Sequence, residues 1–397
     1  MKLTHRATML ACYNGYITQA ISINLAPLLY LTFQKNFSLS LSQIGSLIAF
    51  NFLTQLLIDF FASFFSERIN LRFCAVFAHL MASVGLIGLA VFPYLFAPYP
   101  GLLIAVCCLG MGGGFTEVLI SPLIEACPIE GKSGNMSFLH SFYCWGQAGV
   151  VLFSSVYFYF FTPDLYWHYL PLFWAIVPFV GAIAFCFVPI YRLPSEEQGE
   201  REVIKLFRMP IFWYFLLMMF CAGASELTMA QWASDFAESA LGVSKSVGDL
   251  AGPCMFALLM GIARLLYGKY SEKLNLEWLM VWCCSLCIFS YLLAAVASTP
   301  AFSLIGCALC GFSVGIFWPG VLSRAAASIH GGGIAMFALL AVAGDIGCLS
   351  GPAIAGAVAE LFDGNLRYAF CFATVFPLIH LLLLLIRGKR AGKQEKG

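Results

Sequence analysis

The sequence predicts an all-α membrane protein with twelve transmembrane helices in two pseudo-symmetric six-helix halves. The first observation is composition: the 397 residues are 61% hydrophobic and 10% charged, with a mean hydropathy of +0.88. Soluble domains carry roughly 25% charged residues, so soluble classes are excluded. The second observation is a pair of stretches without Asp, Glu, Lys or Arg: 44 residues follow Arg72 and 46 follow Glu277. Each is about twice the ~20 residues that cross a bilayer as a helix. The third observation is an internal repeat.

The predicted spans are bounded by charged residues, Pro and Gly, and only helices satisfy every backbone group in lipid. The twelve spans lie near residues 7–33, 43–65, 73–96, 101–127, 135–161, 167–191, 210–238, 250–270, 277–298, 301–328, 333–361 and 366–387. The first span is expected to be retained, because no small-residue cleavage site follows it.

The distribution of basic residues predicts the orientation. With both termini in the cytoplasm, the inner segments hold 18 of the 21 Lys and Arg, while the outer loops hold Lys35, Lys245 and Arg367. Such a bias is typical of cytoplasmic loops. We therefore expect a multi-pass protein of the cell (plasma or inner) membrane, monomeric, in contact with lipid.

The chain repeats itself 205 positions apart. Ser66-Glu67-Arg68-Ile69-Asn70-Leu71 returns as Ser271-Glu272-Lys273-Leu274-Asn275-Leu276, and the spans 101–127 and 301–328 each carry a Gly-x-x-x-Gly. The predicted domains are therefore a first half (1–191), a charged cytoplasmic connector (192–209) and a second half with a short basic tail (210–397). Parallel repeats of this kind are typical of transporters, with the substrate bound near the bilayer midplane between them.

Several classes of function lack their sequence signals. No Walker motif, zinc-ligand spacing or nucleophile elbow occurs, so we expect no catalytic residue, no metal and no cofactor. The 16 cysteines lie mostly in apolar runs, where they are expected to pack as small polarizable residues. A net charge of +1 argues against a nucleic-acid partner.

The two cytoplasmic turns resemble the loop motif of the major facilitator superfamily: a small residue, an acid four positions later, a base and a turn residue. Here these positions hold Ser63, Glu67, Arg68 and Asn70, and again Gly268, Glu272, Lys273 and Asn275. The segments Gly113–Pro122 and His140–Gly146 resemble the fucose and glucose permease branch, with Glu117 at the mid-helix acid and His140 and Tyr143 at sugar-facing positions. The first span of fucose-type symporters carries an acid, whereas this one offers Asn14, Gln19 and Asn24.

Ionisable residues inside spans are costly and indicate function. Glu117 is expected to carry a coupling proton or bind substrate; the alternative is a structural hydrogen bond to another helix. Glu226 and Asp345 receive the same two interpretations. Trp232 and Gln231 are expected to grip a sugar by stacking and hydrogen bonding, unless Trp232 belongs to the interfacial aromatic belt. The predicted substrate site comprises Asn14, Gln19, Glu117, His140, Tyr143, Gln147, Glu226, Gln231, Trp232 and Asp345, and the predicted coupling residues are Glu117, Glu226 and Asp345.

Charged residues near the cytoplasmic ends are expected to close an inner gate by salt bridges between the halves. These are Asp59, Glu67, Arg68, Glu125, Arg264, Glu272 and Arg324. Asp59 also belongs to a stripe with Asn51 and Gln55 that either lines the cavity or bonds to a neighbouring helix.

The sequence thus favours a secondary active transporter, not an enzyme, that moves a small polar solute, a sugar or related metabolite, by alternating access with a proton as coupling ion. An exporter of drugs or lipids is the alternative in the same class. A non-transporting sensor or scaffold is the alternative from another class.

Overall fold

The computed structural model describes residues 4–65, 70–161, 163–192, 202–239, 241–242, 250–329 and 331–394. Throughout these ranges the secondary structure is helical, and no strand occurs in them. The prediction of an all-α membrane fold is confirmed. Nine helices of the described residues are long and apolar enough to cross a membrane, and the number of crossings stays a prediction.

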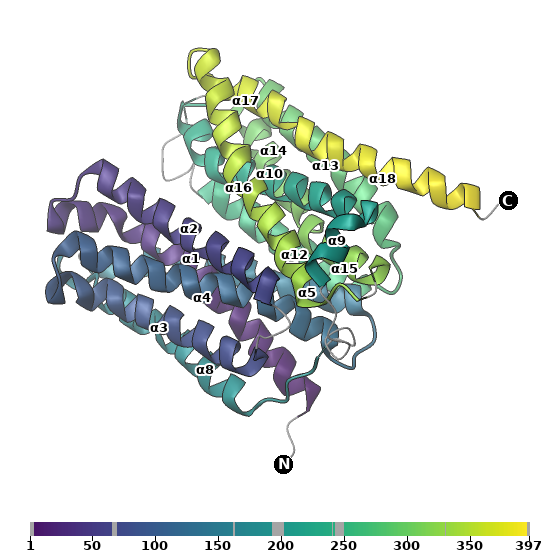
Figure 1. Ribbon diagram of the computed structural model, residues 1–397. Helices are drawn as coiled ribbons and strands as arrows, with labels where there is room; N and C mark the ends of the chain where they lie inside the picture. The colour runs from purple at the N-terminus through teal and green to yellow at the C-terminus, as the bar shows by residue number, and fades with distance from the viewer. Residues whose placement is uncertain are drawn as a thin grey trace. The chain divides into compact units, whose positions relative to one another are not determined.

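Each predicted span falls on one helix or on two consecutive helices. In the first half these are α1 (His5–Phe37), α2 (Leu41–Phe65), α3 (Leu71–Leu95), α4 (Pro98–Ala126), α5 (Lys132–Phe160), α6 (Pro163–Tyr166), α7 (Tyr169–Trp174) and α8 (Ile176–Phe187). The predicted connector contains a short helix, α9 (Glu202–Arg208). The second half comprises α10 (Pro210–Ser239), η3 (Leu250–Cys254), α12 (Met255–Tyr270), α13 (Leu276–Val296), α14 (Pro300–Val314), α15 (Phe317–Ser328), α16 (Gly333–Leu361), α17 (Leu366–Ala373) and α18 (Val375–Gln394) (Figure 1).

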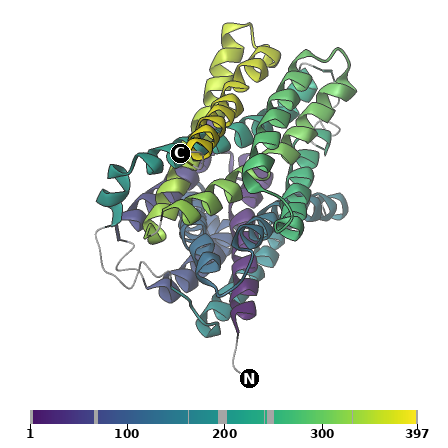
Figure 2. The same cartoon turned by 90° about the vertical axis from the view of Figure 1, so that its right-hand side faces the viewer.

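The chain divides into two compact units. The first unit comprises Met1–Ile129, Phe142–Val203 and Gly331–Leu339; the second comprises Glu130–Ser141, Ile204–His330 and Leu340–Gly397. The second unit therefore includes the first turns of α5. Within the first unit α3 packs along α4, and within the second α13 packs along α14. α17 and α18 follow one another near the end of the chain (yellow in Figure 2).

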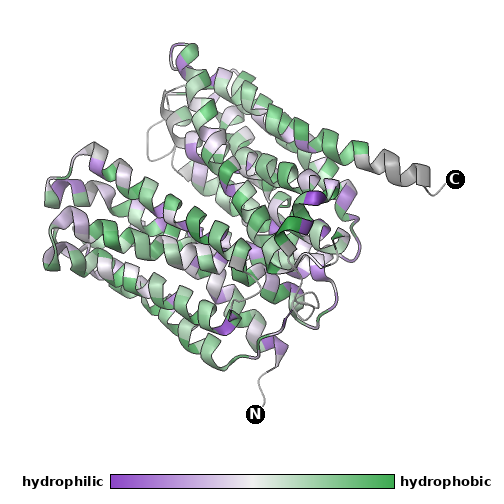
Figure 3. Cartoon of the chain, in the orientation of Figure 1, coloured by the Kyte–Doolittle hydropathy of each residue, from purple (hydrophilic) through white to green (hydrophobic). Residues whose placement is uncertain are grey.

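Hydrophobic residues make up most of the helical segments (green in Figure 3). A buried cluster at the centre of the first unit draws on α1, α3 and α4, and includes Ile21, Leu25, Leu86, Leu89, Leu102 and Val106. Large apolar side chains such as Phe64 and Trp282 are more than half exposed. In a bilayer that surface meets lipid, which is as apolar as these side chains.

Matched contacts in the two units support the internal repeat. The side chain of Asn70 accepts a hydrogen bond from the N–H of Phe73 at 3.2 Å and caps α3, and 205 positions later Asn275 caps α13 through the N–H of Trp278 at 3.1 Å. Such a cap satisfies one of the helix's unpaired N–H groups. The same short sequence therefore begins a helix in the same way twice.

Glycines also bring equivalent helices together in both units. In the first unit, a Cβ on Gly110 would lie 2.5 Å from the carbonyl oxygen of Asn51, so α4 touches the backbone of α2. In the second unit, Gly311 of α14 faces the carbonyl of Phe256 on α12 in the same manner. Small residues at helix interfaces permit this close approach in membranes.

Candidate substrate and coupling site

Glu117 of α4 lies between two amide side chains of the first unit. Gln19 of α1 and Gln55 of α2 each donate a hydrogen bond from Nε2 to Glu117 Oε2, both at 2.7 Å. Glu117 is partly exposed, while Gln19 and Gln55 are 4% and 3% exposed. Hydrogen bonds to an ionised acceptor are shorter and stronger than neutral ones, so the pair of amides stabilises a negative charge on this oxygen.

Glycines next to Glu117 explain how Gln55 reaches it. A Cβ on Gly114 would lie 3.0 Å from the carbonyl oxygen of Gln55, so α2 runs against the bare backbone of α4 at this level. One turn from Glu117, the hydroxyl groups of Tyr16 and Ser121 are hydrogen-bonded at 2.9 Å and join α1 to α4. The sequence prediction did not include Gln55 in the substrate site, although its spacing from Asp59 was visible.

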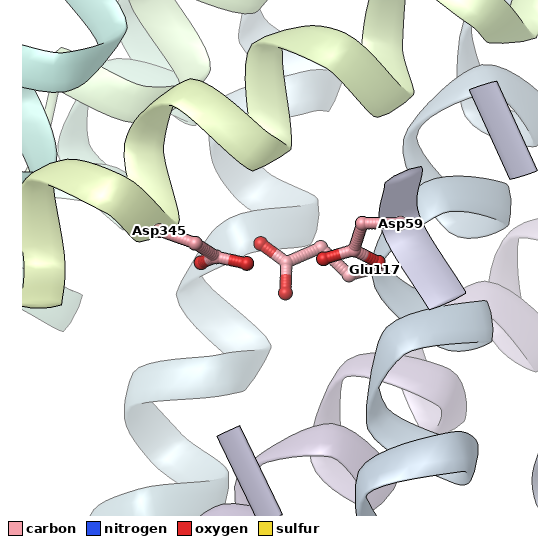
Figure 4. A group of neighbouring side chains, drawn as sticks. All are labelled: Asp59, Glu117 and Asp345. Carbon is pink, nitrogen blue, oxygen red and sulfur yellow. The ribbon is translucent and has the colours of Figure 1, made fainter. Parts of the chain in front are cut away.

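Asp59 is a second buried acid in the same place. Its side chain is fully buried on α2, and one of its carboxylate oxygens lies within 4.8 Å of one of Glu117 (Figure 4). Like charges at this separation repel strongly away from water, so the pair favours a proton or a cation between or on its members. The structure therefore places Asp59, predicted as a gate residue, beside the predicted coupling residue.

Asn14, Tyr143 and Gln147 are three further predicted site residues of the first unit. Asn14 donates from Nδ2 to the carbonyl of Val177 at 3.3 Å, which joins α1 to α8. Tyr143 and Gln147 lie one turn apart on α5 and are both partly exposed. Among the described residues, no hydrogen bond links Asn14 or Gln147 to Glu117.

The second unit has its own charged centre, at Arg264 of α12. This residue is 2% exposed, and the acceptors of its guanidinium include two backbone carbonyls and one carboxylate. Nε donates to the carbonyl of Gly315 at 2.9 Å, at the break between α14 and α15. Nη1 donates to the carbonyl of His140 at 3.2 Å, in the part of α5 that belongs to this unit.

The third acceptor of Arg264 is Glu226, a predicted coupling residue. Nη2 of Arg264 lies 3.3 Å from Oε2 of Glu226, and the two side chains are 3% and 14% exposed. A buried charge needs a partner of opposite sign, and each residue supplies one for the other. His140 is buried beside this pair, 5% exposed.

The predicted sugar-gripping residues of α10 have different surroundings. Gln231 is exposed, and Trp232 is partly exposed with its Nε1–H donating to the carbonyl of Pro352 at 3.0 Å. A Cβ on Gly356 would lie 3.0 Å from the Trp232 ring, so the indole covers a bare stretch of α16. Asp345 lies on the same helix, partly exposed, between Gly344 and Gly347, which face Trp318 and the carbonyl of Phe220.

The structure describes the surroundings of some of the predicted gate residues. Glu67 and Arg68 lie outside the described residues. Nη2 of Arg324 pairs with Oε1 of Glu277 at 2.9 Å, within the second unit. Glu272 is exposed, and a Cβ on Gly131 would lie 3.9 Å from its Oε1, so its carboxylate lies near the N-terminus of α5, where negative charge is favourable. Glu125, at the end of α4, is partly exposed.

The start of α5 packs closely on the end of α12 in the second unit. The hydroxyl of Ser137 donates to the carbonyl of Arg264 at 2.9 Å, and the hydroxyls of Tyr267 and Ser133 lie 3.2 Å apart. A Cβ on Gly268 would lie 2.9 Å from Cβ of Phe138. Gly268 is the small residue of the second repeat of the loop motif, and its lack of a side chain permits this contact.

Comparison with known proteins identifies the fold. A family model described as Major Facilitator Superfamily matches residues 8–337 and 255–397. No curated protein sequence matches the chain. Among solved structures, the transporter FucP in the outward conformation has a TM-score of 0.82 at 14% identity, over 96% of this chain and 98% of that one.

Two further solved structures share the fold. The proton:xylose symporter XylE bound to 6-bromo-6-deoxy-D-glucose has a TM-score of 0.79 at 13% identity, over 96% of this chain and 95% of its own. The human organic anion transporter MFSD10 (TETRAN) has a TM-score of 0.72 at 15% identity, over 96% of this chain and 99% of that one. At these identities the likeness concerns the fold.

Proposed function

Since the chain belongs to the major facilitator superfamily, a family of transporters rather than enzymes, we propose that it imports a small polar solute, a sugar or related metabolite, by alternating access with a proton as the coupling ion. The observation that carries this proposal is the Glu117 centre, in which one carboxylate is held by Gln19 and Gln55 at 2.7 Å each. FucP, a fucose:proton symporter, and XylE, a proton:xylose symporter, share this fold and agree with the proposal.

Glu117 is suited to carry a proton because two features of its surroundings have opposite effects on the charge of its carboxyl group. Burial penalises the charged form of a carboxyl, while donated hydrogen bonds stabilise that form. A change in the contacts of α1 or α2 would alter the position of one amide donor and thereby the balance between the two protonation states. The substrate is proposed to bind near this centre, with the partly exposed Tyr143 and Gln147 of α5 as further contacts in the first unit. The sequence pattern of α10 adds Trp232 to the proposed contacts.

The decisive experiment uses Glu117→Gln in proteoliposomes. The substituted amide is neutral, like a protonated carboxyl, and has nearly the same shape. We expect the variant to keep substrate binding and counterflow exchange but to lose accumulation driven by a pH gradient. A solute for the assay is first found by thermal shift of the purified protein with a panel of sugars and related metabolites.

Glu360→Gln is the matched control, because Glu360 is exposed near the end of α16. It should accumulate solute like the wild type. If Glu117→Gln still concentrates solute when only a pH difference is imposed, Glu117 has a structural role, and the coupling group must be sought at Asp345 or Glu226.

A further inference from the structure

Two buried amide oxygens in the first unit accept no hydrogen bond from the residues that the structure describes. They are Oε1 of Gln19 and Oε1 of Gln55, in side chains that are 4% and 3% exposed. Buried polar atoms almost always have a partner, so each of these oxygens is an acceptor that a water or an ion can fill. Both oxygens belong to the amides whose nitrogens donate to Glu117.

From these oxygens and the neighbouring acids, we propose that the first unit holds a monovalent cation, Na⁺, between Asp59 and Glu117, with the amide oxygens of Gln19 and Gln55 as further ligands. The oxygen and nitrogen of an amide share one carbon, so each Oε1 lies close to the Glu117 carboxylate. A carboxylate oxygen of Asp59 lies within 4.8 Å of one of Glu117. The side chains of α1, α2 and α4 thus bring amide and carboxylate oxygens to the surroundings of Glu117 (Figure 4 labels Asp59 and Glu117).

A glycine leaves room beside these oxygens. A Cβ built on Gly113 would meet Oε1 of Gln55 at 3.1 Å and its amide carbon at 3.9 Å, and no other atom of the described chain within 4 Å outside its own helix neighbourhood. Gly113 precedes Glu117 by one helical turn and so lies on the same face of α4. A larger residue at this position would fill the space next to the amide oxygen.

The chemistry of the ligands selects the ion. Carboxylate and carbonyl oxygens suit hard cations, and this set contains no sulfur or imidazole nitrogen that would favour transition metals. A cation also offsets the charge of two neighbouring carboxylates, of which that of Asp59 is fully buried, and like charges repel one another away from water. A divalent ion held by two carboxylates away from water would leave slowly, whereas a coupling ion must leave in every cycle. Na⁺ satisfies both requirements.

The inference rests on the proposed function only in giving the ion a place in the transport cycle. Na⁺ would occupy the centre that carries the proton in the proposed function, so that either ion could accompany the solute. Binding of Na⁺ is measured without transport. A failure of proton coupling therefore leaves the cation site standing, and a failure of Na⁺ binding leaves proton coupling untouched.

The test measures binding of radioactive Na⁺ to the purified full-length protein in detergent by a scintillation proximity assay. We expect saturable binding in the wild type. The melting temperature should rise by about 3 °C or more when NaCl replaces choline chloride at equal ionic strength, with Na⁺ well above its Kd. Asp59→Asn should weaken binding at least tenfold. Gln55→Met keeps the size of the side chain and the net charge but removes Oε1, and should weaken binding severalfold.

Glu360→Gln removes one exposed carboxylate far along the chain from this centre and should bind Na⁺ like the wild type. Should Asp59→Asn fail to give a monodisperse protein, Gln55→Met decides the question. The proposal is overturned if the wild type shows no Na⁺-specific binding, or if both variants bind as tightly as it does. Displacement of Na⁺ by Ca²⁺ or Mg²⁺ at far lower concentrations would overturn the monovalent assignment.

Discussion

Asp59 on α2 and Arg264 on α12 occupy the same place in the two repeats, 205 positions apart, and both are buried, 0% and 2% exposed. The contacts around them keep the same register: the carbonyl of Asn51 faces a glycine of α4, and the carbonyl of Phe256 faces a glycine of α14. An acid in one unit therefore corresponds to a base in the other. The repeat preserves the backbone packing while the charge at this position is reversed.

This reversal gives the two units different electrostatics. Asp59 lies next to another acid, so the first unit concentrates negative charge at one point. Arg264 instead neutralises Glu226 at 3.3 Å. We infer that cation exchange belongs to the first unit, whereas the second unit contributes a fixed ion pair.

The glycine contacts predict opposite effects for two alanine substitutions. Gly110→Ala should lower the melting temperature, because its Cβ would lie 2.5 Å from the carbonyl oxygen of Asn51 and force the helices apart, at a cost of about 1–3 kcal/mol. Gly149→Ala should be neutral or stabilising by up to about 1 kcal/mol, because a Cβ there would meet no described atom within 4 Å and Ala favours helix. Thermal unfolding in detergent measures both. Equal effects of the two variants would contradict the close approach of α2 and α4.

Trp232 forms a hydrogen bond through Nε1 and also offers an aromatic ring, and substitutions can remove the two one at a time. Trp232→Phe keeps an aromatic ring over Gly356 but loses the hydrogen bond from Nε1 to the carbonyl of Pro352. We expect a loss of stability of about 1 kcal/mol, with apparent solute affinity little changed if the ring alone stacks on the solute. Trp232→Ala should lose stability further and weaken solute binding at least tenfold. An affinity that stays at the wild-type value in Trp232→Ala would remove Trp232 from the proposed substrate site.

The orientation of the chain is tested by chemical labelling. We expect a cysteine placed at Ser239, at the end of α10, to react with a membrane-impermeant maleimide added to intact cells, and one placed at Gln394 to react only after permeabilisation. The reason is the excess of Lys and Arg in the segments assigned to the cytoplasm. The parent protein, whose 16 cysteines should stay largely unlabelled inside apolar helices, is the control. The reverse pattern would invert the orientation, and labelling of both positions from outside would rule out the five crossings predicted between Ser239 and Gln394.

The helical class and the repeat could be predicted because they depend on local features, whereas the role of Glu117 stays a prediction. Charge-free runs of sufficient length form spans wherever they occur, and Asn70 and Asn275 cap their own helices. The helix stripe of Asn51, Gln55 and Asp59 was also visible, since three positions four residues apart lie on one face. The sequence alone did not show that this stripe packs against α4, because that contact depends on how closely α2 approaches α4 at Gly114.

The surroundings of longer side chains were the least predictable. Arg264 lies near the end of a predicted span, and its gate role stays a prediction. The contact of its long flexible side chain with Glu226 could not be derived from the sequence. Asn14 lies on a polar position of α1 that faces α8 and bonds to Val177. A one-dimensional pattern identifies a face of a helix, whereas the neighbour of that face depends on the tertiary arrangement.

The ion pair of Arg264 and Glu226 predicts strong non-additivity. Arg264→Leu should destabilise the protein by about 3–5 kcal/mol, because it leaves the Glu226 carboxylate buried without its partner. Glu226→Leu should have a similar effect, since the guanidinium then loses the carboxylate 3.3 Å away that balances its charge, whereas the carbonyls of Gly315 and His140 are neutral acceptors. The double variant should be markedly more stable than the sum of the two losses predicts, because no uncompensated charge remains.

The non-additivity is measured by thermal unfolding, in detergent, of the wild type, the two single variants and the double variant. Arg324→Leu with Glu277→Leu is the matched control, because that pair is shorter, 2.9 Å, but Glu277 is 43% exposed and water screens it. Its coupling should be within about 1 kcal/mol. Additive losses at Arg264 and Glu226 would show that the pair is not a closed ion pair in the membrane protein, and Glu226 would then return as a candidate for coupling.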